Sequence, residues 1–341
     1  LEFHEKIFFP RRARREPLYL ATLRGPPFRL VEIAEVKMPL PTPFHERTKA
    51  LCQTYHWKEW AGYVSVCTYG LSLDREYNAI RQGSALFDVS PLFKYSVTGP
   101  DAGAFLARVL VRDVSRMRPG RMTYLCWCDD RGKVIDDGTC ARLSKESFLL
   151  TAAAPAFHWL MRHAGPYDVR IQDISADTGA LALQGPTSRD LLAQICDADM
   201  AKLPYFGIVD ARFSGGFQGR ISRTGYTGDL GYEIWVDRKD ALALWDLLME
   251  EGSRYGIVPT GLDALDISRI EAGFILRGVD YIGANEALIE AQTSTPYELG
   301  LGWTVRLKDR APFIGQAALE REKRCSMASL LLKKRMREQA L

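Results

Sequence analysis

One stretch, Arg223-Thr-Gly-Tyr-Thr-Gly-Asp-Leu-Gly-Tyr-Glu-Ile-Trp-Val236, decides how the chain is interpreted. Three glycines recur in it at every third position: Gly225, Gly228 and Gly231. Glycine adds no side chain to a core and costs backbone entropy, so this spacing predicts tight bends or close approaches of the chain. We expect a loop that feeds a strand, Tyr232–Val236. That strand carries a carboxylate, Glu233, where strand interiors are normally apolar, so we expect the charge to need a partner.

A second informative stretch is Gly132-Lys-Val-Ile-Asp-Asp-Gly138, in which two carboxylates are adjacent. Asp136 and Asp137 follow an apolar pair and lead into a strand-like segment that ends near Leu143. Because neighbouring strand residues point to opposite faces, one carboxylate can face solvent while the other faces inward. The alternative is that Asp137 only caps a turn beside Gly138.

The composition is that of an ordinary globular enzyme. The chain has 341 residues, of which 47% are hydrophobic and 26% charged, so it can bury a sizeable core and suggests two or three domains. No apolar run approaches the ~18 residues needed to span a bilayer. The seven cysteines are odd in number and scattered, which favours a reducing compartment over a disulfide framework. We therefore expect a cytoplasmic protein.

The sequence offers no metal-binding spacing. Cys126 and Cys128 flank Trp127, and two cysteines on one face of a strand are more typical of buried small hydrophobes than of metal ligands. His158 and His163 are five residues apart and would diverge on a helix. We predict that the protein binds no metal.

Charge separates the ends of the chain from its body. Residues 1–37 contain eight Lys/Arg and five Asp/Glu, and residues 321–341 contain seven and two. We expect residues 1–37 to form a basic extension without stable structure. Its acidic residues argue against a transit peptide, and we expect neither nucleic acid nor a membrane as a partner.

Strands and helices alternate along the body without regular βαβ units, which predicts an α+β fold with largely antiparallel strands. No Gly-x-Gly-x-x-Gly motif follows a strand, so a dinucleotide-binding sheet is not expected. Expected helices are Leu71–Gln82, Ala102–Leu110, Pro155–His163, Thr187–Cys196, Lys239–Tyr255 and Asp263–Ala272. Expected strands lie within Phe87–Val97, Tyr124–Trp127, Val134–Leu143, Phe148–Ala152, Val169–Ile174, Ala180–Gln184, Phe206–Phe213, Arg220–Arg223 and Tyr232–Val236.

Three further blocks complete a pattern with the two stretches above: Ser84-Ala-Leu-Phe-Asp-Val-Ser90, Leu181-Ala-Leu-Gln-Gly-Pro186 and Arg269-Ile-Glu-Ala-Gly273. Together the five blocks resemble the folate-binding aminomethyltransferase family, which comprises the T-protein of the glycine cleavage system and its relatives. The resemblance runs in order from about Thr42 to about Leu319.

The resemblance implies a fold of interleaved antiparallel sheet domains, flanked by helices, around a folate channel. We expect residues 38–295 to form this folate-binding part as two interleaved subdomains. Residues 296–341 resemble only the entrance to the family's last domain, so we expect a truncated remnant of a C-terminal β-barrel followed by a basic tail.

The resemblance also assigns roles to four residues. Asp137 occupies the position of the catalytic carboxylate, which would lie beside N5 of the cofactor, tetrahydrofolate. Glu233 matches a carboxylate that binds the N–H groups of the pterin ring. Tyr226 and Tyr124 stand where aromatic side chains line the folate path, although either could equally be core packing.

One position departs from the family pattern. Members of the glycine cleavage system carry an arginine where this chain has Leu265, and a leucine cannot supply that charge. Arg269, one helical turn away, is expected instead to pair with Asp266. The partner is therefore either a lipoyl carrier protein or a small one-carbon donor, and we expect a monomer.

The resemblance thus implies a tetrahydrofolate-dependent one-carbon transferase, an enzyme that moves an aminomethyl or methyl group from an amine or ether donor to tetrahydrofolate. One alternative is a tetrahydrofolate-dependent demethylase of a small methylated compound. Another is a truncated folate-binding protein without catalytic activity.

Overall fold

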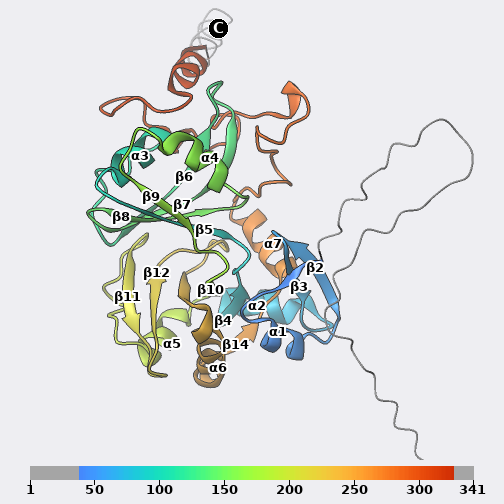
Figure 1. Ribbon diagram of the computed structural model, residues 1–341. Coiled ribbons are helices and arrows are strands. Elements are labelled where there is room, and N and C mark those ends of the chain that lie inside the picture. The colour runs from blue at the N-terminus through green and yellow to red at the C-terminus, as the bar shows by residue number, and fades with distance from the viewer. Residues whose placement is uncertain (1–37, 326–341) are drawn as a thin grey trace, which may run out of the picture. The chain divides into compact units, whose positions relative to one another are not determined.

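The computed structural model describes residues 38–325 (Figure 1), so the expected extension 1–37 and the tail 326–341 lie outside the described residues. The helices are α1 His45–Leu51, α2 Leu73–Gln82, α3 Ala102–Val109, α4 Phe157–Ala164, α5 Ser188–Ile195, α6 Ala241–Gly252 and α7 Leu262–Glu271, with a further helical segment at 316–325. Short 3-10 turns are Arg238–Asp240, Ser253–Tyr255, Glu290–Gln292 and Gly302–Thr304. The strands are β1 Leu40–Pro41, β2 His56–Trp60, β3 Tyr63–Thr68, β4 Ser84–Asp88, β5 Phe93–Thr98, β6 Arg121–Cys128, β7 Val134–Ser144, β8 Ser147–Ala152, β9 Arg170–Asp173, β10 Thr178–Gln184, β11 Ile208–Arg212, β12 Gln218–Ser222, β13 Gly231–Asp237 and β14 Ile257–Pro259.

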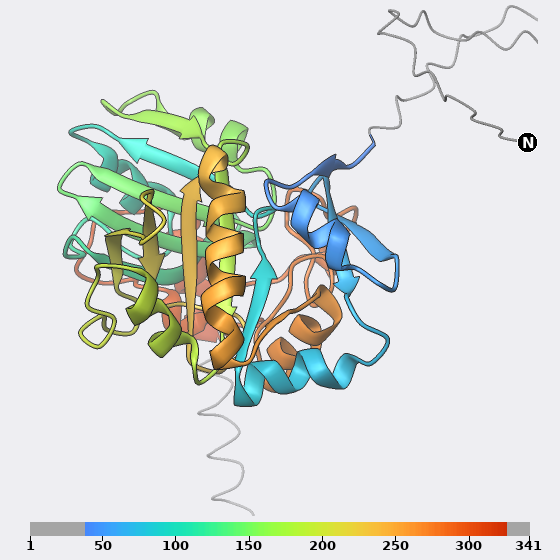
Figure 2. The same cartoon turned by 90° about the horizontal axis from the view of Figure 1, so that it is seen from below.

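The first large sheet has six strands in the order β11-β12-β13-β10-β4-β14. All its neighbours are antiparallel except β14, which pairs with β4 in parallel. Alternate residues of β10 and β13, such as Leu183 and Ile234, point to one face, where helices α5 and α6 cover them (Figure 2). Leu192 and Trp245 of these helices are buried in the same cluster, so this face is closed by apolar packing.

The second large sheet is antiparallel throughout, with the order β6-β7-β8-β5-β9. Its strands come from the chain between β4 and β10, so this sheet is inserted into the connectivity of the first. The expected meander of three short strands is confirmed as β6, β7 and β8. Helices α3 and α4 cover the outer face (Figure 1), where Phe105 and Leu160 pack against Tyr95 and Phe148.

The inner faces of the two sheets meet in what we call the inter-sheet layer. Its buried side chains include Met122, Ala141 and Leu149 of the five-stranded sheet and Trp235 of the six-stranded sheet. Helix α7 closes one end of the layer with Leu265. Since strand residues alternate between faces, the residues of β10 and β13 that do not face α5 and α6 point into this layer, as do Met122 of β6 and Ala141 of β7.

A small sheet, β1-β3-β2, precedes these elements, and no element was expected from the sequence in this region. A buried carboxylate, Glu76 of α2, fastens it to the rest of the fold. Glu76 accepts the N–H of Tyr69 at 2.7 Å and the N–H of Gly261, at the start of α7, at 2.8 Å. A charged hydrogen-bond acceptor thus ties the end of β3 and the start of α7 to α2.

Most expected elements are confirmed within a few residues, but one differs. The strand-like stretch Phe87–Val97 is two strands, β4 and β5, because the chain leaves the six-stranded sheet and enters the five-stranded one between them. Pro91 lies in this crossing, where a residue without an N–H costs no ladder hydrogen bond.

The last described part of the chain packs on the five-stranded sheet. Leu301, Phe313 and Leu319 are buried against Cys126 and Val134. Between 296 and 325 the structure shows a 3-10 turn and a helix but no strand, so the expected barrel remnant is not confirmed.

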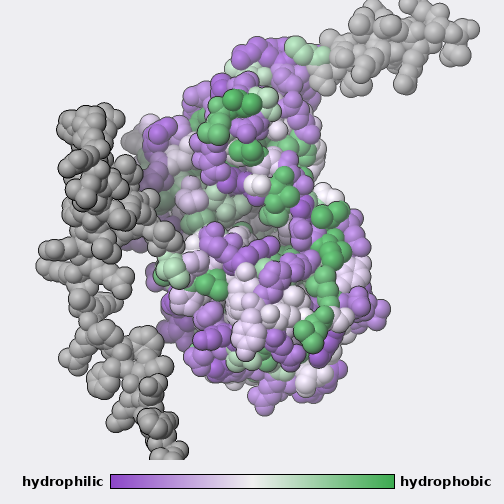
Figure 3. Space-filling view, turned by 90° about the vertical axis from the view of Figure 1, so that its right-hand side faces the viewer, coloured by the Kyte–Doolittle hydropathy of each residue, from purple (hydrophilic) through white to green (hydrophobic). Residues whose placement is uncertain are grey.

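On the face shown in Figure 3, hydrophilic residues dominate and hydrophobic ones form small separate patches. Within residues 38–325, no helix has the length and apolar character required to cross a bilayer.

The close contact between β7 and β8 at Gly138 predicts that a larger residue there destabilises the fold. A Cβ at Gly138 would overlap the carbonyl oxygen of Thr151, so Gly138→Ala should lower the free energy of unfolding by about 1–3 kcal/mol in urea titrations. Gly165 provides the control, because its backbone is right-handed and no atom lies within 4 Å of the place that a Cβ would take. Gly165→Ala should be neutral or slightly stabilising, and an equal loss in both variants would contradict the prediction.

Candidate active site

The glycine-rich loop between β12 and β13 is wrapped around one buried side chain, Gln184 at the end of β10. The Gln184 Nε2 donates to the carbonyl oxygens of Thr224 at 3.3 Å and Tyr232 at 3.2 Å, and its Oε1 accepts from the Thr227 hydroxyl at 3.1 Å. A Cβ at Gly225 or Gly231 would overlap the Gln184 amide. Close approach to this amide is therefore the reason for two of the three glycines.

The third glycine has a different cause. Gly228 has φ of +81°, a left-handed conformation that other residues adopt at a cost, and a Cβ there would also crowd Ala272 of the segment after α7. The expected loop feeding a strand is thereby confirmed, since β13 begins at Gly231.

Glu233, the carboxylate of that strand, points into the inter-sheet layer. Its neighbours Tyr232 and Ile234 are buried on the other face, under α5 and α6. The Glu233 Oε2 accepts from the Thr224 hydroxyl at 2.8 Å, which is its only protein hydrogen bond among the described residues. Burial raises the pKa of Glu233, while Thr224 and the charge of Lys94 oppose this rise. One carboxylate oxygen is left to accept hydrogen bonds from a ligand.

Asp137 lies within β7 opposite Cys126, so the alternative that it caps a turn beside Gly138 is wrong. It is half-buried, and two phenol groups hold its carboxylate. The Tyr124 hydroxyl donates to Oδ2 at 2.7 Å, and the Tyr281 hydroxyl donates to Oδ1. Burial raises the pKa of Asp137, whereas these two hydrogen bonds and the charge of Arg277 lower it.

Asp136 faces the other way, as expected for adjacent strand residues. It is 2% exposed and accepts the N–H of Asp137 at 2.8 Å and the N–H of Ala154 at 2.9 Å. The Arg277 guanidinium lies 3.6 Å from its carboxylate. Burial, and then the charge of Asp137, raise the pKa of Asp136 to about 7.

The two tyrosines expected on the folate path lie near Asp137. Tyr124 is stacked on Trp303, with ring centroids 6.1 Å apart. Tyr226 is stacked on Phe274 at 5.6 Å and donates its hydroxyl to the carbonyl oxygen of Ile275. Burial and the nearby charge of Asp137 raise the pKa of both tyrosines, so both remain neutral donors. Each also joins an apolar cluster, so both tyrosines take part in packing.

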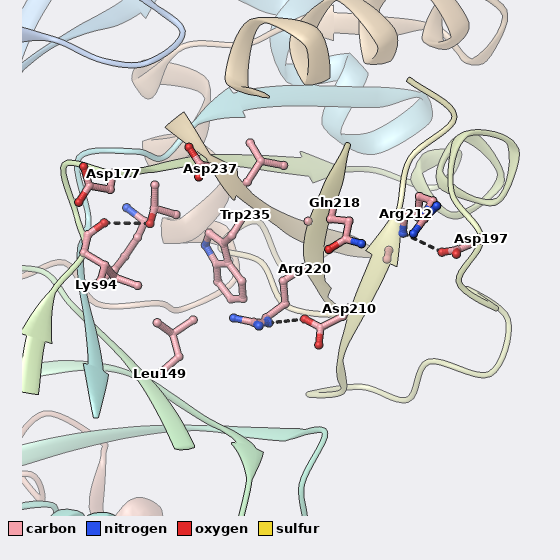
Figure 4. A pocket seen from close by; sticks show the side chains of 15 residues that line it. Lys94, Leu149, Asp177, Asp197, Asp210, Arg212, Gln218, Arg220, Trp235 and Asp237 are labelled. Carbon is pink, nitrogen blue, oxygen red and sulfur yellow. Dashed lines mark hydrogen bonds and ion pairs between the residues drawn. The ribbon is translucent and has the colours of Figure 1, made fainter. Parts of the chain in front are cut away.

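Asp137 and Glu233 therefore face the same layer from opposite sheets, by strand alternation in β7 and β13. An open groove of about 680 Å³ adjoins this layer (Figure 4). Trp235, two residues beyond Glu233 on the same face, and Lys94 of β5 line it, together with the Asp210–Arg220 pair, which is joined at 2.7 Å.

Three contributors to the site were missed from the sequence. Tyr281 and Trp303 reach Asp137 and Tyr124 from loops more than 140 residues further along the chain, and neither lies in a periodic segment that could signal its place. Gln184 stood in a quoted block, but its role as the support of the glycine loop follows only from the three-dimensional contact. Within residues 38–325, no group of three or more His, Cys, Asp or Glu side chains could hold a metal ion.

The two sheets enclose a layer with a phenol-bound carboxylate on one side and a second carboxylate on the other, an arrangement typical of enzymes. Comparison with known proteins agrees. The family model described as the GCVT N-terminal domain matches residues 43–309.

Relatives support the same assignment. The chain is 36% identical over 256 residues to an aminomethyltransferase of Geobacillus thermodenitrificans, covering 74% of this chain and 67% of that protein. It is 35% identical over 269 residues to an aminomethyltransferase of Clostridium botulinum, covering 78% and 70%. A solved structure, the glycine cleavage system aminomethyltransferase T of Bartonella henselae, matches with a TM-score of 0.72 and 27% identity, covering 84% of this chain and 75% of that one.

The chain thus belongs to the GCVT aminomethyltransferase family, whose members are transferase enzymes. The resemblance drawn from the sequence is confirmed, and so is the mixed α+β fold. The chain spans about two thirds of the length of the curated relatives named here.

The buried Asp136 predicts a pH dependence of stability. Its carboxyl group ionises at its ordinary pKa of 3.8 in the unfolded chain but only near pH 7 in the folded one. Its contribution to stability is therefore fully present at low pH and is lost as the pH rises from about 4 to 7. Asp136→Asn removes this titration, so the free energy of unfolding of the wild type minus that of the variant should fall by about 2 kcal/mol between pH 5 and pH 8. Urea titrations at both pH values measure it, and a constant difference would contradict the assignment.

Proposed function

We propose that this protein is a tetrahydrofolate-dependent one-carbon transferase that moves an aminomethyl or methyl group from an amine or ether donor to tetrahydrofolate. The observation that carries the proposal is the position of Asp137. Its carboxylate is fixed by the hydroxyl groups of Tyr124 and Tyr281 and, by strand alternation, faces the inter-sheet layer, as Glu233 does from the other sheet.

The residues present fit a folate. A pterin ring offers adjacent N–H donors, and a carboxylate with one unpartnered oxygen, such as Glu233, suits them. The stacked pair of Tyr226 and Phe274 gives a planar apolar wall for the rest of such a ligand. Bound tetrahydrofolate would supply N5 as the acceptor of the one-carbon unit.

The chain's own contribution is electrostatic and positional. The two phenols orient the Asp137 carboxylate and, together with Arg277, favour its ionised form against the effect of burial. A fixed negative charge stabilises positive charge that develops on the transferred group, and it does so without reorganising solvent. Because neither phenol ionises near neutral pH, both remain donors through the reaction.

A second candidate, demethylation of a small methylated donor, has a specific observation in its favour. Leu265 is 9% exposed in the apolar end of the inter-sheet layer, where the glycine cleavage members are expected to carry an arginine. Arg269 does not replace that charge, because its Nε donates to Asp266 at 2.7 Å and its Nη1 donates to Asp280. The expected pairing with Asp266 is confirmed, and the guanidinium of Arg269 is bound by Asp266 and Asp280.

The catalytic assignment predicts that Asp137→Asn abolishes turnover and leaves the fold intact, because an amide keeps the size but not the charge. Asp136→Asn should reduce turnover far less, since Asp136 points away from the layer. Transfer to tetrahydrofolate and circular dichroism of both variants provide the test. Equal loss in both, or loss in Asp136→Asn alone, would show that the wrong carboxylate was chosen.

The folate assignment predicts that Glu233→Gln weakens tetrahydrofolate binding by roughly 30- to 150-fold, about 2–3 kcal/mol, because the amide turns a donor toward a donor. Tyr232→Phe is the matched control. The Tyr232 hydroxyl is buried without a partner among the described residues, so its removal should be neutral or slightly stabilising. Calorimetric titration decides, and unchanged affinity in Glu233→Gln would move the pterin pocket elsewhere.

The leucine at position 265 leads to a prediction about which one-carbon donor the protein uses. The wild type should form methylene-tetrahydrofolate only slowly from an aminomethyl-lipoyl carrier protein, with the Geobacillus aminomethyltransferase as the positive control. A parallel screen of methylated amines and ethers should then yield the better substrate. Efficient transfer from the carrier protein would remove the case for the demethylase.

A further inference from the structure

Lys94 is a buried cation that none of the roles described above uses. It lies on β5, opposite Thr151 of β8, and its side chain is 1% exposed. Its neighbours Tyr95 and Val97 alternate onto the outer face, into the cluster under α3 and α4. By strand alternation, the side chain of Lys94 points to the opposite face of the sheet, toward the inter-sheet layer.

The hydrogen bonds of Lys94 leave part of its capacity unused. Its Nζ donates to the carbonyl oxygens of Ser90 at 2.9 Å and Leu92 at 2.6 Å. An ammonium group has three N–H donors, so one is not accounted for by the protein. Within residues 38–325, Lys94 takes part in no ion pair, so no carboxylate oxygen lies within 4.0 Å of its Nζ.

This arrangement is costly for a purely structural residue. A buried charge is normally paired, and burial lowers the pKa of Lys94 to about 8 although nearby carboxylates, Asp88 first, oppose this fall. A neutral side chain could tie the two carbonyl groups at less cost. The unpaired donor therefore points to an acceptor that the protein itself does not supply.

Two carboxylates of the six-stranded sheet, Asp88 and Glu233, influence the charge of Lys94. Asp88 and then Glu233 raise the pKa of Lys94, and Lys94 in turn lowers that of Glu233. Lys94 and Trp235 line the same groove (Figure 4), and Trp235 shares its strand face with Glu233. A ligand edge held by Glu233 therefore lies beside Lys94.

We propose that Lys94 determines specificity at this site by donating a hydrogen bond to the ring carbonyl oxygen of a 2-amino-4-oxo pterin whose N–H donors are bound by Glu233. The inference rests on the proposed folate function and adds to it a preference for a 4-oxo ring over a 4-amino ring. A carboxylate accepts the two adjacent N–H donors, and the ammonium donates to the neighbouring carbonyl. A 2,4-diamino ring would place an amino donor against the ammonium.

Folic acid and its 4-amino counterpart, aminopterin, are the probes, titrated calorimetrically at pH 7. The wild type should bind folic acid at least about tenfold more tightly. Lys94→Met should weaken folic acid binding by about 10- to 100-fold and aminopterin binding by less than about threefold, because only the former loses a charge-assisted hydrogen bond. Since aminopterin also lacks the N3–H, the assignment of Lys94 rests on the change in the affinity ratio.

Lys145→Met, at an exposed position in the turn between β7 and β8, is the control and should leave both affinities unchanged. Lys94→Gln keeps a donor for the carbonyl oxygens of Ser90 and Leu92 and serves if the methionine variant fails to fold; its affinity ratio should also fall. A wild type that binds aminopterin as tightly as folic acid, or an unchanged ratio in a folded Lys94 variant, would overturn the proposal for Lys94 alone. A wild type that binds neither compound nor tetrahydrofolate would overturn the folate function with it.

Discussion

The site depends on a single buried amide. Gln184 ends the central strand β10 with its side chain fully enclosed, and an enclosed amide must find partners for both its donor and its acceptor. The chain supplies them by bending the loop between β12 and β13 around it, which requires glycine where the backbone passes closest. That bend delivers Thr224 to the Glu233 carboxylate and starts β13 in the register that turns Glu233 inward.

In the facing five-stranded sheet, the position of a residue along its strand likewise decides the surroundings of its side chain. Asp136 and Asp137 are adjacent on one strand, yet their environments are made different by the alternation of strand faces. Asp136 satisfies backbone N–H groups and shares Arg277, whereas Asp137 takes only phenol donors and retains contact with the layer. Two identical side chains thus acquire different surroundings from one residue's difference in position.

Local patterns in the sequence were enough for the elements that have strong periodicity or punctuation. The meander β6–β8, the helices α2, α3, α5, α6 and α7, and the strand that bears Glu233 were all predictable in this way. The division of Phe87–Val97 into two strands was not, because it depends on the chain passing from one sheet to the other. Asp137 and Glu233 were found by resemblance to a family, and the structure adds their partners. Tyr281 and Trp303 carry no local signal, since their places follow from contacts between distant segments.

The insertion of the five-stranded sheet between β4 and β10 also bears on how the protein folds. Each sheet contributes one of the two carboxylates, so the layer between them consists of contacts with large separation along the chain. Such contacts incur loop-closure entropy before they contribute any stabilisation, and they form slowly. The layer should therefore close last, after each sheet has gathered its own helices, and binding competence should appear later in refolding than secondary structure does. A ligand that bridges the two sheets would then stabilise contacts that form late, and it would slow unfolding more than it speeds folding.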